Sequence, residues 1–97
     1  MLSLDVCKDR LAEFKNRFGE KYGISRIGIF GSVARGEQTE ESDLDIVVDV
    51  SNPTWEVMFS LREQLEQYLE CAIDLVRYRP SLRPLLKSNI DKEAIYV

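Results

Sequence analysis

The chain has 97 residues, 44% of them hydrophobic and 31% charged, which is typical of a globular protein, and we expect one domain over residues 1–97. Seventeen acidic and thirteen basic residues give a formal net charge of −4, which argues against bulk electrostatic binding of DNA, RNA or an anionic membrane. With no histidine and only two cysteines, the composition excludes histidine-based triads and zinc chemistry.

The first predicted element is an amphipathic helix over residues 3–22. Its apolar residues recur at helical spacing, and Gly23 is a natural stop after Cys7, Leu11, Phe14 and Phe18. Early charges and the lack of a long apolar run argue against a signal peptide or a membrane span, so we expect a cytoplasmic protein. The two cysteines, Cys7 and Cys71, are interpreted as small packing residues.

Two strands follow the helix. Residues 25–30 form a short apolar run that ends at Gly31, which indicates a buried strand leading into a tight turn. Residues 32–42 are predicted to be a short helical turn and a polar loop. Residues 43–50 alternate with period two, placing Leu44, Ile46, Val48 and Val50 on one face and Asp43, Asp45, Val47 and Asp49 on the other.

The second half of the chain alternates helices and strands. Asn52 is predicted as the N-cap of a helix with Pro53 at its first position, ending near Glu70, with an apolar stripe of Met58, Leu61, Leu65 and Tyr68. A strand over residues 71–76, a helix over residues 81–91 and a last strand at "AIYV" complete the prediction.

This order of elements predicts an α/β or α+β fold, a small mixed sheet flanked by helices. The first two strands are separated by too little chain for a crossover helix, so we expect them to be antiparallel. The second and third strands have a helix between them and can be parallel.

Three aspartates suggest a site for a metal ion. Asp43 and Asp45 point the same way with Cα atoms about 6.6 Å apart, whereas Asp49 lies about 13 Å beyond Asp45 and is expected to be a solvated charge. Taken alone, Asp43 and Asp45 are explained more simply by an amphipathic strand with its polar face toward solvent. Asp74, however, lies in an apolar run without an obvious solvent face, and an unpaired buried carboxylate is costly. If its strand pairs with the second strand, all three carboxylates converge, and oxygen-only ligands favour Mg²⁺.

Gly31 and Ser32 suggest a phosphate site beside the aspartates. Glycine permits close backbone approach, and the amides after Ser32, with its hydroxyl, can hold phosphate oxygens. Arg35 is within reach of the same phosphates. An ordinary turn after a strand and a surface arginine are the simpler interpretation of each feature alone.

A basic stretch, "VRYRPSLRPLLK", lies near the C-terminus. Its cations are able to serve phosphate or an acidic partner, although a solvated helix face is the simpler interpretation of Arg77, Arg79, Arg83 and Lys87.

Gly31-Ser32, ten intervening residues and then Asp43-Leu44-Asp45 resemble the signature of the polymerase-beta-type nucleotidyltransferases, with Asp74 in the place of the third carboxylate. "GSVARGEQTEESDLDIVV" in particular resembles the minimal nucleotidyltransferases (MNT) of prokaryotes. The resemblance implies Mg²⁺-dependent transfer of AMP from ATP to a hydroxyl, with Asp43, Asp45 and Asp74 as metal-binding and catalytic residues. Gly31, Ser32 and Arg35 are then expected to contact the phosphates.

The same resemblance implies a protein partner. Minimal nucleotidyltransferases of this type are similar to antitoxins paired with HEPN-domain toxins, some of which they adenylylate on a tyrosine. Two alternatives remain open: an antitoxin that acts by binding alone, with an exposed aromatic such as Trp55 or Tyr78 as anchor, and a nucleotidyltransferase with a small-molecule acceptor. No direct contact with nucleic acid or membrane is expected.

Overall fold

The computed structural model describes residues 3–97 and confirms a mixed α/β fold with a four-stranded sheet. The elements in chain order are α1 (Leu4–Tyr22), β1 (Ile24–Phe30), α2 (Gly31–Arg35), β2 (Leu44–Val50), α3 (Trp55–Leu69), β3 (Ile73–Arg77), α4 (Pro84–Glu93) and β4 (Ile95–Tyr96). The strands lie in the order β3-β2-β1-β4.

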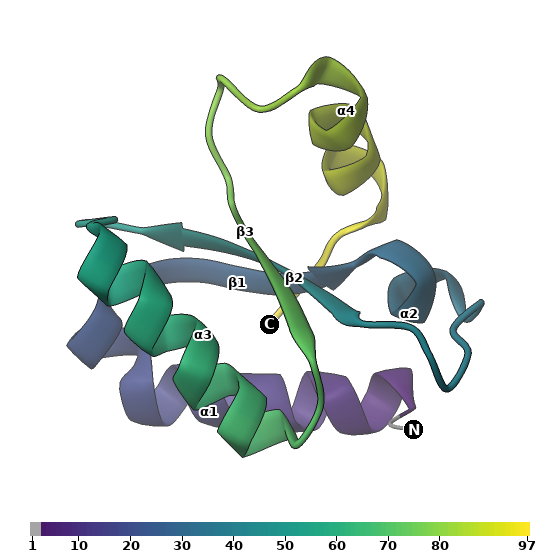
Figure 1. Cartoon of the computed structure of the whole chain (residues 1–97), viewed down its shortest axis with the longest axis horizontal. Helices are drawn as coiled ribbons and strands as arrows, with labels where there is room; N and C mark the ends of the chain where they lie inside the picture. Colours follow the sequence, from purple (N-terminus) through teal and green to yellow (C-terminus); the bar gives the residue numbers. More distant parts are fainter. Residues whose placement is uncertain (1–2) are drawn as a thin grey trace.

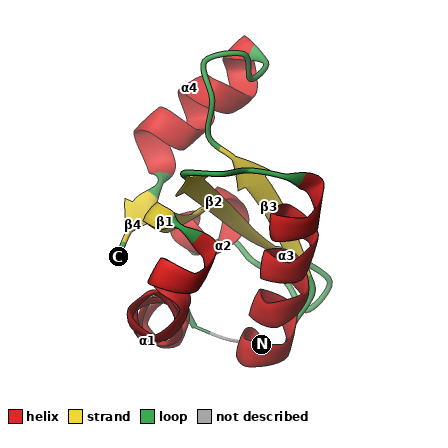
Figure 2. Ribbon diagram, turned by 90° about the vertical axis from the view of Figure 1, so that its left-hand side faces the viewer, coloured by secondary structure: helices red, strands yellow, loops and turns green. Residues whose placement is uncertain are grey.

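The strand directions agree with the prediction. β1 is antiparallel to β2 and to β4, whereas β2 and β3 are parallel and α3 crosses between them. Figure 2 shows α1 and α3 together on one face of the sheet and α4 on the other. No helix in residues 3–97 is both long and apolar enough to cross a membrane.

Helix α1 ends at the predicted stop, and its first residue lies within one residue of the predicted start. The hydroxyl of Ser3 accepts a hydrogen bond from the Val6 amide, and Gly23 ends the helix in the left-handed conformation with φ 68°. Its apolar stripe packs against α3 and one face of the sheet, in a core that includes Leu11, Phe14, Ile27, Ile29, Ile46, Val48, Leu61 and Leu65. The predicted packing role of Cys7 is confirmed, since it is buried in this core.

The starts of two helices differ from the prediction. Helix α3 begins at Trp55, because the hydroxyl of Thr54, not the side chain of Asn52, accepts from the Val57 amide. Helix α4 begins at Pro84 rather than at residue 81, because proline lacks an N–H group and the first helical residue needs none. It ends at Glu93 rather than near residue 91. Asn52 and Thr54 both precede the apolar run of α3 and are both common N-cap residue types.

Helix α4 covers the face of the sheet that carries the acidic residues of β2. It forms a second, smaller core from Phe30, Val47, Leu82 and Ile90. Val47 is therefore fully buried, although it shares its face with Asp45 and Asp49. This face of the sheet is therefore only partly exposed to solvent: α4 covers its middle, and both ends remain accessible.

Candidate active site

The pairing of β2 with β3 brings two of the predicted carboxylates together. Asp45 and Asp74 are direct partners in the parallel register of these strands. Opposed residues in neighbouring strands project from the same face with backbones about 4.8 Å apart. The two side chains therefore lie side by side, although they are 29 residues apart in the sequence.

The turn at Gly31 lies directly against Asp45. Phe30, the last residue of β1, is the register partner of Asp45, and Gly31 follows it with φ +73°. A β-carbon at Gly31 would lie 2.9 Å from Cγ of Asp45 and closer still to its Oδ2. Only glycine fits this close approach, so the Gly31-Ser32 turn and the carboxylate pair form one site.

Asp45 is the electrostatic centre of this site. Partial burial, reinforced by the neighbouring Asp74 carboxylate and more weakly by Asp43, raises the pKa of Asp45 to about 6. A divalent cation or a cluster of donors at this position would stabilise the ionised form and reverse that effect.

Asp43 precedes β2 and is exposed. It is near enough to raise the pKa of Asp45, yet no three His, Cys, Asp or Glu side chains within residues 3–97 are grouped so as to hold a metal ion. Mg²⁺ commonly binds through one or two carboxylates together with substrate phosphates. The oxygen donors of Asp45 and Asp74 therefore fit this ion, with Asp43 at the edge of the site.

The predicted burial of Asp74 is wrong. Its side chain is exposed, as is Ala72 before it, because β3 is an edge strand and α4 covers only the later part of its face, around Val76. The apolar neighbours of Asp74 suggested a buried strand, but the sequence does not show where the covering helix ends. The exposure leaves Asp74 accessible to a ligand.

Arg35 lies at the end of α2 and is held by two carboxylates. Its guanidinium donates to Glu37 at 3.2 Å and to Glu93 of α4 at 2.9 Å. It is near enough to Asp45 to act weakly against the raised pKa of that carboxyl. The contact with Glu93 spans 58 residues and has no local sequence signal, so sequence reasoning missed Glu93.

Asp49 and the basic stretch lie away from this site. Asp49 pairs with Arg26 at 3.7 Å and is part-exposed, in agreement with its prediction as a solvated charge. Lys87 pairs with Asp91 at 3.1 Å within α4.

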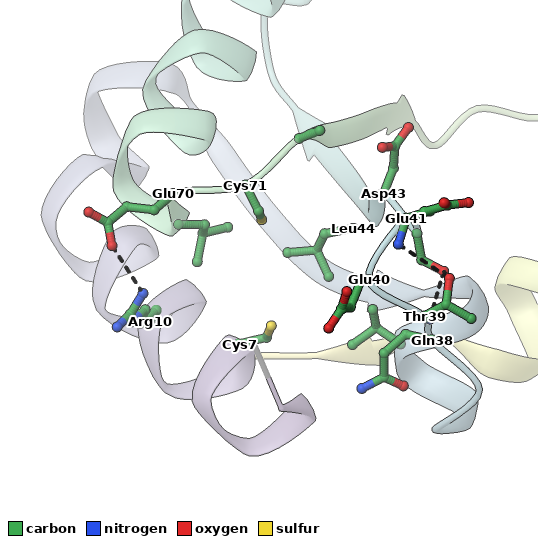
Figure 3. A pocket seen from close by; sticks show the side chains of 14 residues that line it. Cys7, Arg10, Gln38, Thr39, Glu40, Glu41, Asp43, Leu44, Glu70 and Cys71 are labelled. Carbon is green, nitrogen blue, oxygen red and sulfur yellow. Dashed lines mark hydrogen bonds and ion pairs between the residues drawn. The ribbon is translucent and has the colours of Figure 1, made fainter. Parts of the chain in front are cut away.

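A cavity of about 570 Å³ borders the loop that carries Asp43 (Figure 3). Cys7 and Cys71 contribute to its walls, and Asp43 is the one predicted site residue that borders it. Burial, followed by the nearby second thiol, raises the pKa of Cys7, so this thiol stays protonated at neutral pH. The cavity is thus separate from the Gly31, Asp45 and Asp74 side chains.

Residues 13–97 match the family model described as polymerase beta, nucleotidyltransferase. The protein MJ1379 of Methanocaldococcus jannaschii is 38% identical over 100 residues, covering the whole of both chains. The protein adenylyltransferase MntA of Thermococcus cleftensis is 37% identical over 98 residues, covering 100% of this chain and 98% of that protein.

Solved structures show the same fold. A minimal nucleotidyltransferase superposes with a TM-score of 0.79 at 35% identity, covering 97% of this chain and 95% of that chain. A toxin–antitoxin complex with AMP-PNP (TM-score 0.74, 22% identity) covers 92% of this chain and 70% of that chain. An AMPylated Shewanella oneidensis HEPN toxin with its MNT antitoxin (TM-score 0.66, 18% identity) covers 96% and 70%, respectively.

Proposed function

Because this chain belongs to the polymerase-beta nucleotidyltransferase family, we propose that it is a protein adenylyltransferase that modifies a HEPN-type toxin and acts as its antitoxin. The donor is ATP, the reaction depends on Mg²⁺, and the acceptor is a hydroxyl of the partner, with tyrosine as the expected residue. The observation that carries this proposal is the register of Asp45 with Asp74 against the Gly31 turn.

The comparisons support the donor and the partner. One structural neighbour is a toxin–antitoxin complex with the ATP analogue AMP-PNP, and another pairs an MNT antitoxin with an AMPylated HEPN toxin. A relative 37% identical to this chain is named protein adenylyltransferase. Transfer of AMP forms a bond from the acceptor oxygen to the α-phosphorus and releases pyrophosphate.

In this proposal Asp45 and Asp74, with Asp43 at the edge of the site, would hold Mg²⁺; the bound ion would neutralise phosphate charge and favour loss of the proton from the acceptor hydroxyl. Gly31 lets the turn approach the triphosphate closely, and the Ser32 hydroxyl donates to a phosphate oxygen. Asp74, which is exposed at the sheet edge, would complete the metal site or accept the acceptor's proton. Arg35 contacts the phosphates once it leaves Glu93. These residues position the reactants and balance charge.

A second candidate function is neutralisation of the partner by binding alone. Trp55 and Phe59 favour it: they stack at 5.2 Å on α3, and 74% and 46% of their surfaces are exposed. Asp45 lies at the start of β2, whereas Trp55 comes after its end. The Trp55–Phe59 pair is therefore separate from the candidate active site.

The mass of the partner separates the two functions. Incubation of the toxin with this chain, ATP and Mg²⁺ should add the mass of one or more AMP groups to the toxin, and EDTA or the Asp45→Asn variant should prevent the addition. An unmodified toxin that is nevertheless inactive, with Asp45→Asn equally protective, would establish the binding function instead.

A further inference from the structure

Within residues 3–97, three arginines at the end of β3 and in the segment after it have no carboxylate oxygen within 4.0 Å. Every other arginine in residues 3–97 has a carboxylate oxygen within 4.0 Å, in the pairs made by Arg10, Arg17, Arg26, Arg35 and Arg62. Arg77, Arg79 and Arg83 form no such pair, although the chain has an excess of acidic residues.

These arginines line one hollow of about 270 Å³ beside β3 and the loop that leads to α4. That loop is at the top of Figure 1. Ser81 contributes a hydroxyl to the wall, and Leu75, Leu82 and Leu86 contribute apolar surface. The hollow therefore combines a cluster of like charges, a hydrogen-bonding group and apolar contacts.

The loop is held in shape by its own hydrogen bonds. The Arg79 guanidinium donates to the carbonyl of Arg77 at 2.8 Å, and the Leu82 amide donates to the carbonyl of Arg79 at 3.2 Å. The Tyr78 amide donates to the carbonyl of Val48 in β2 at 2.9 Å, which ties the loop to the sheet. The three arginines are therefore already grouped before a ligand binds. An anion can be bound by them without the entropy cost of ordering the loop.

The outer edge of β3 adds a second recognition element. β3 is the last strand of the sheet on this side, so its outward backbone groups have no strand partner. An extended peptide is able to pair with such an edge, while its side chains reach neighbouring pockets. Arg77 lies three residues after Asp74 on this strand, about 10 Å along it.

We propose that the hollow lined by Arg77, Arg79 and Arg83, with the free edge of β3, binds an extended acidic segment of the partner protein. The apolar wall and the strand edge suit a peptide better than a nucleic acid, for which the net charge of −4 is unfavourable. Resting on the proposed function, this surface places the partner so that its acceptor hydroxyl reaches Asp45 and Asp74.

The test uses the double variant R79E/R83E and the matched control R17E/R62E. Both change the net charge equally, but the control removes arginines that pair with Glu13 and Glu66 on other helices. The probe is a fluorescein-labelled peptide in which glutamate alternates with valine around one tyrosine, followed by fluorescence anisotropy. A peptide with glutamine in place of glutamate and a labelled oligodeoxythymidine serve as comparisons.

We expect the acidic peptide to bind the unmodified chain and the control equally, and to bind R79E/R83E about tenfold or more weakly. The glutamine peptide should not bind. Absence of acidic-peptide binding to the unmodified chain, equal affinity in the two variants, or tighter binding of oligodeoxythymidine than of the acidic peptide would each overturn the proposal.

Two further measurements separate this surface from the proposed catalysis. If both proposals hold, R79E/R83E binds ATP with Mg²⁺ normally but has a raised KM for the toxin, with kcat little changed. An unchanged KM would overturn the docking surface and leave the adenylyltransferase standing. Arginine-dependent peptide binding without any AMP transfer would reject the catalytic function alone.

Discussion

The Asp45 carboxyl group has a clearly raised pKa. The increase, to about 6, arises from partial burial followed by the proximity of Asp74 and Asp43. Without a cation, the ionised form of Asp45 therefore lowers the stability of the folded state. A residue retained at a cost to stability is a common feature of functional sites.

Replacement of Asp45 by Asn should stabilise the protein at pH 8 in EDTA. Between pH 3.8, the ordinary value, and about 6 the folded chain keeps a proton that the unfolded chain has lost, so stability falls as pH rises. Because solvent screens the partly buried group, we expect Asn to raise the free energy of unfolding by about 1–2 kcal/mol above pH 6. Urea unfolding at pH 8 and pH 4 tests this, since the gain should vanish at pH 4.

Replacement of Gly31 by Ala should damage both fold and site. The residue has φ +73°, and the added β-carbon would overlap the Asp45 carboxylate. We expect a loss of about 2 kcal/mol or more in urea unfolding, together with weaker ATP binding. Gly36→Ala is the matched control: it has the same φ of +73° but open space around it, so a loss of ATP binding in Gly36→Ala as well would contradict a specific contact with Asp45.

Local patterns predicted the elements well, because each depends on residues close in sequence. The alternation in β2 and the Gly23 stop of α1 are such cases. The pairing of Asp45 with Asp74 followed from a helix long enough to link parallel strands. The exposure of Asp74 and the contact of Arg35 with Glu93 could not be predicted, because both depend on where α4 lies over the sheet.

The two-residue strand β4 depends on a glycine in β1. A β-carbon at Gly28 would lie 2.8 Å from the Ile95 carbonyl oxygen and 2.9 Å from Cδ1 of Tyr96. Gly28→Ala should therefore displace β4 and cost about 1–3 kcal/mol of unfolding free energy. Gly19→Ala in α1 has space, with Lys15 Cγ at 3.7 Å, and should gain about 0.5–1 kcal/mol. Equal effects of the two variants in urea unfolding would contradict this role of Gly28.

At the scale of the whole molecule, the two faces of the sheet have different roles: one forms the larger core, and the other carries the candidate active site. The face covered by α1 and α3 forms the larger core, whereas α4 covers only the middle of the other face (Figure 2). One open end of that face holds Gly31, Asp45 and Asp74. The unpaired arginines follow Asp74 on the edge strand and in the loop after it, so the proposed docking surface adjoins the strand that carries Asp74.

Calorimetric titration of ATP, with Mg²⁺ or with EDTA, tests most directly whether Gly31, Asp45 and Asp74 form one nucleotide site. The variants are Asp45→Asn and Asp74→Asn, and the control is Asp49→Asn, which removes the same charge from the far end of β2. We expect Mg²⁺-dependent binding by the unmodified chain and the control, and affinities at least about tenfold lower for the two site variants. Equal affinity in all four folded proteins, or binding indifferent to Mg²⁺, would contradict the proposed site.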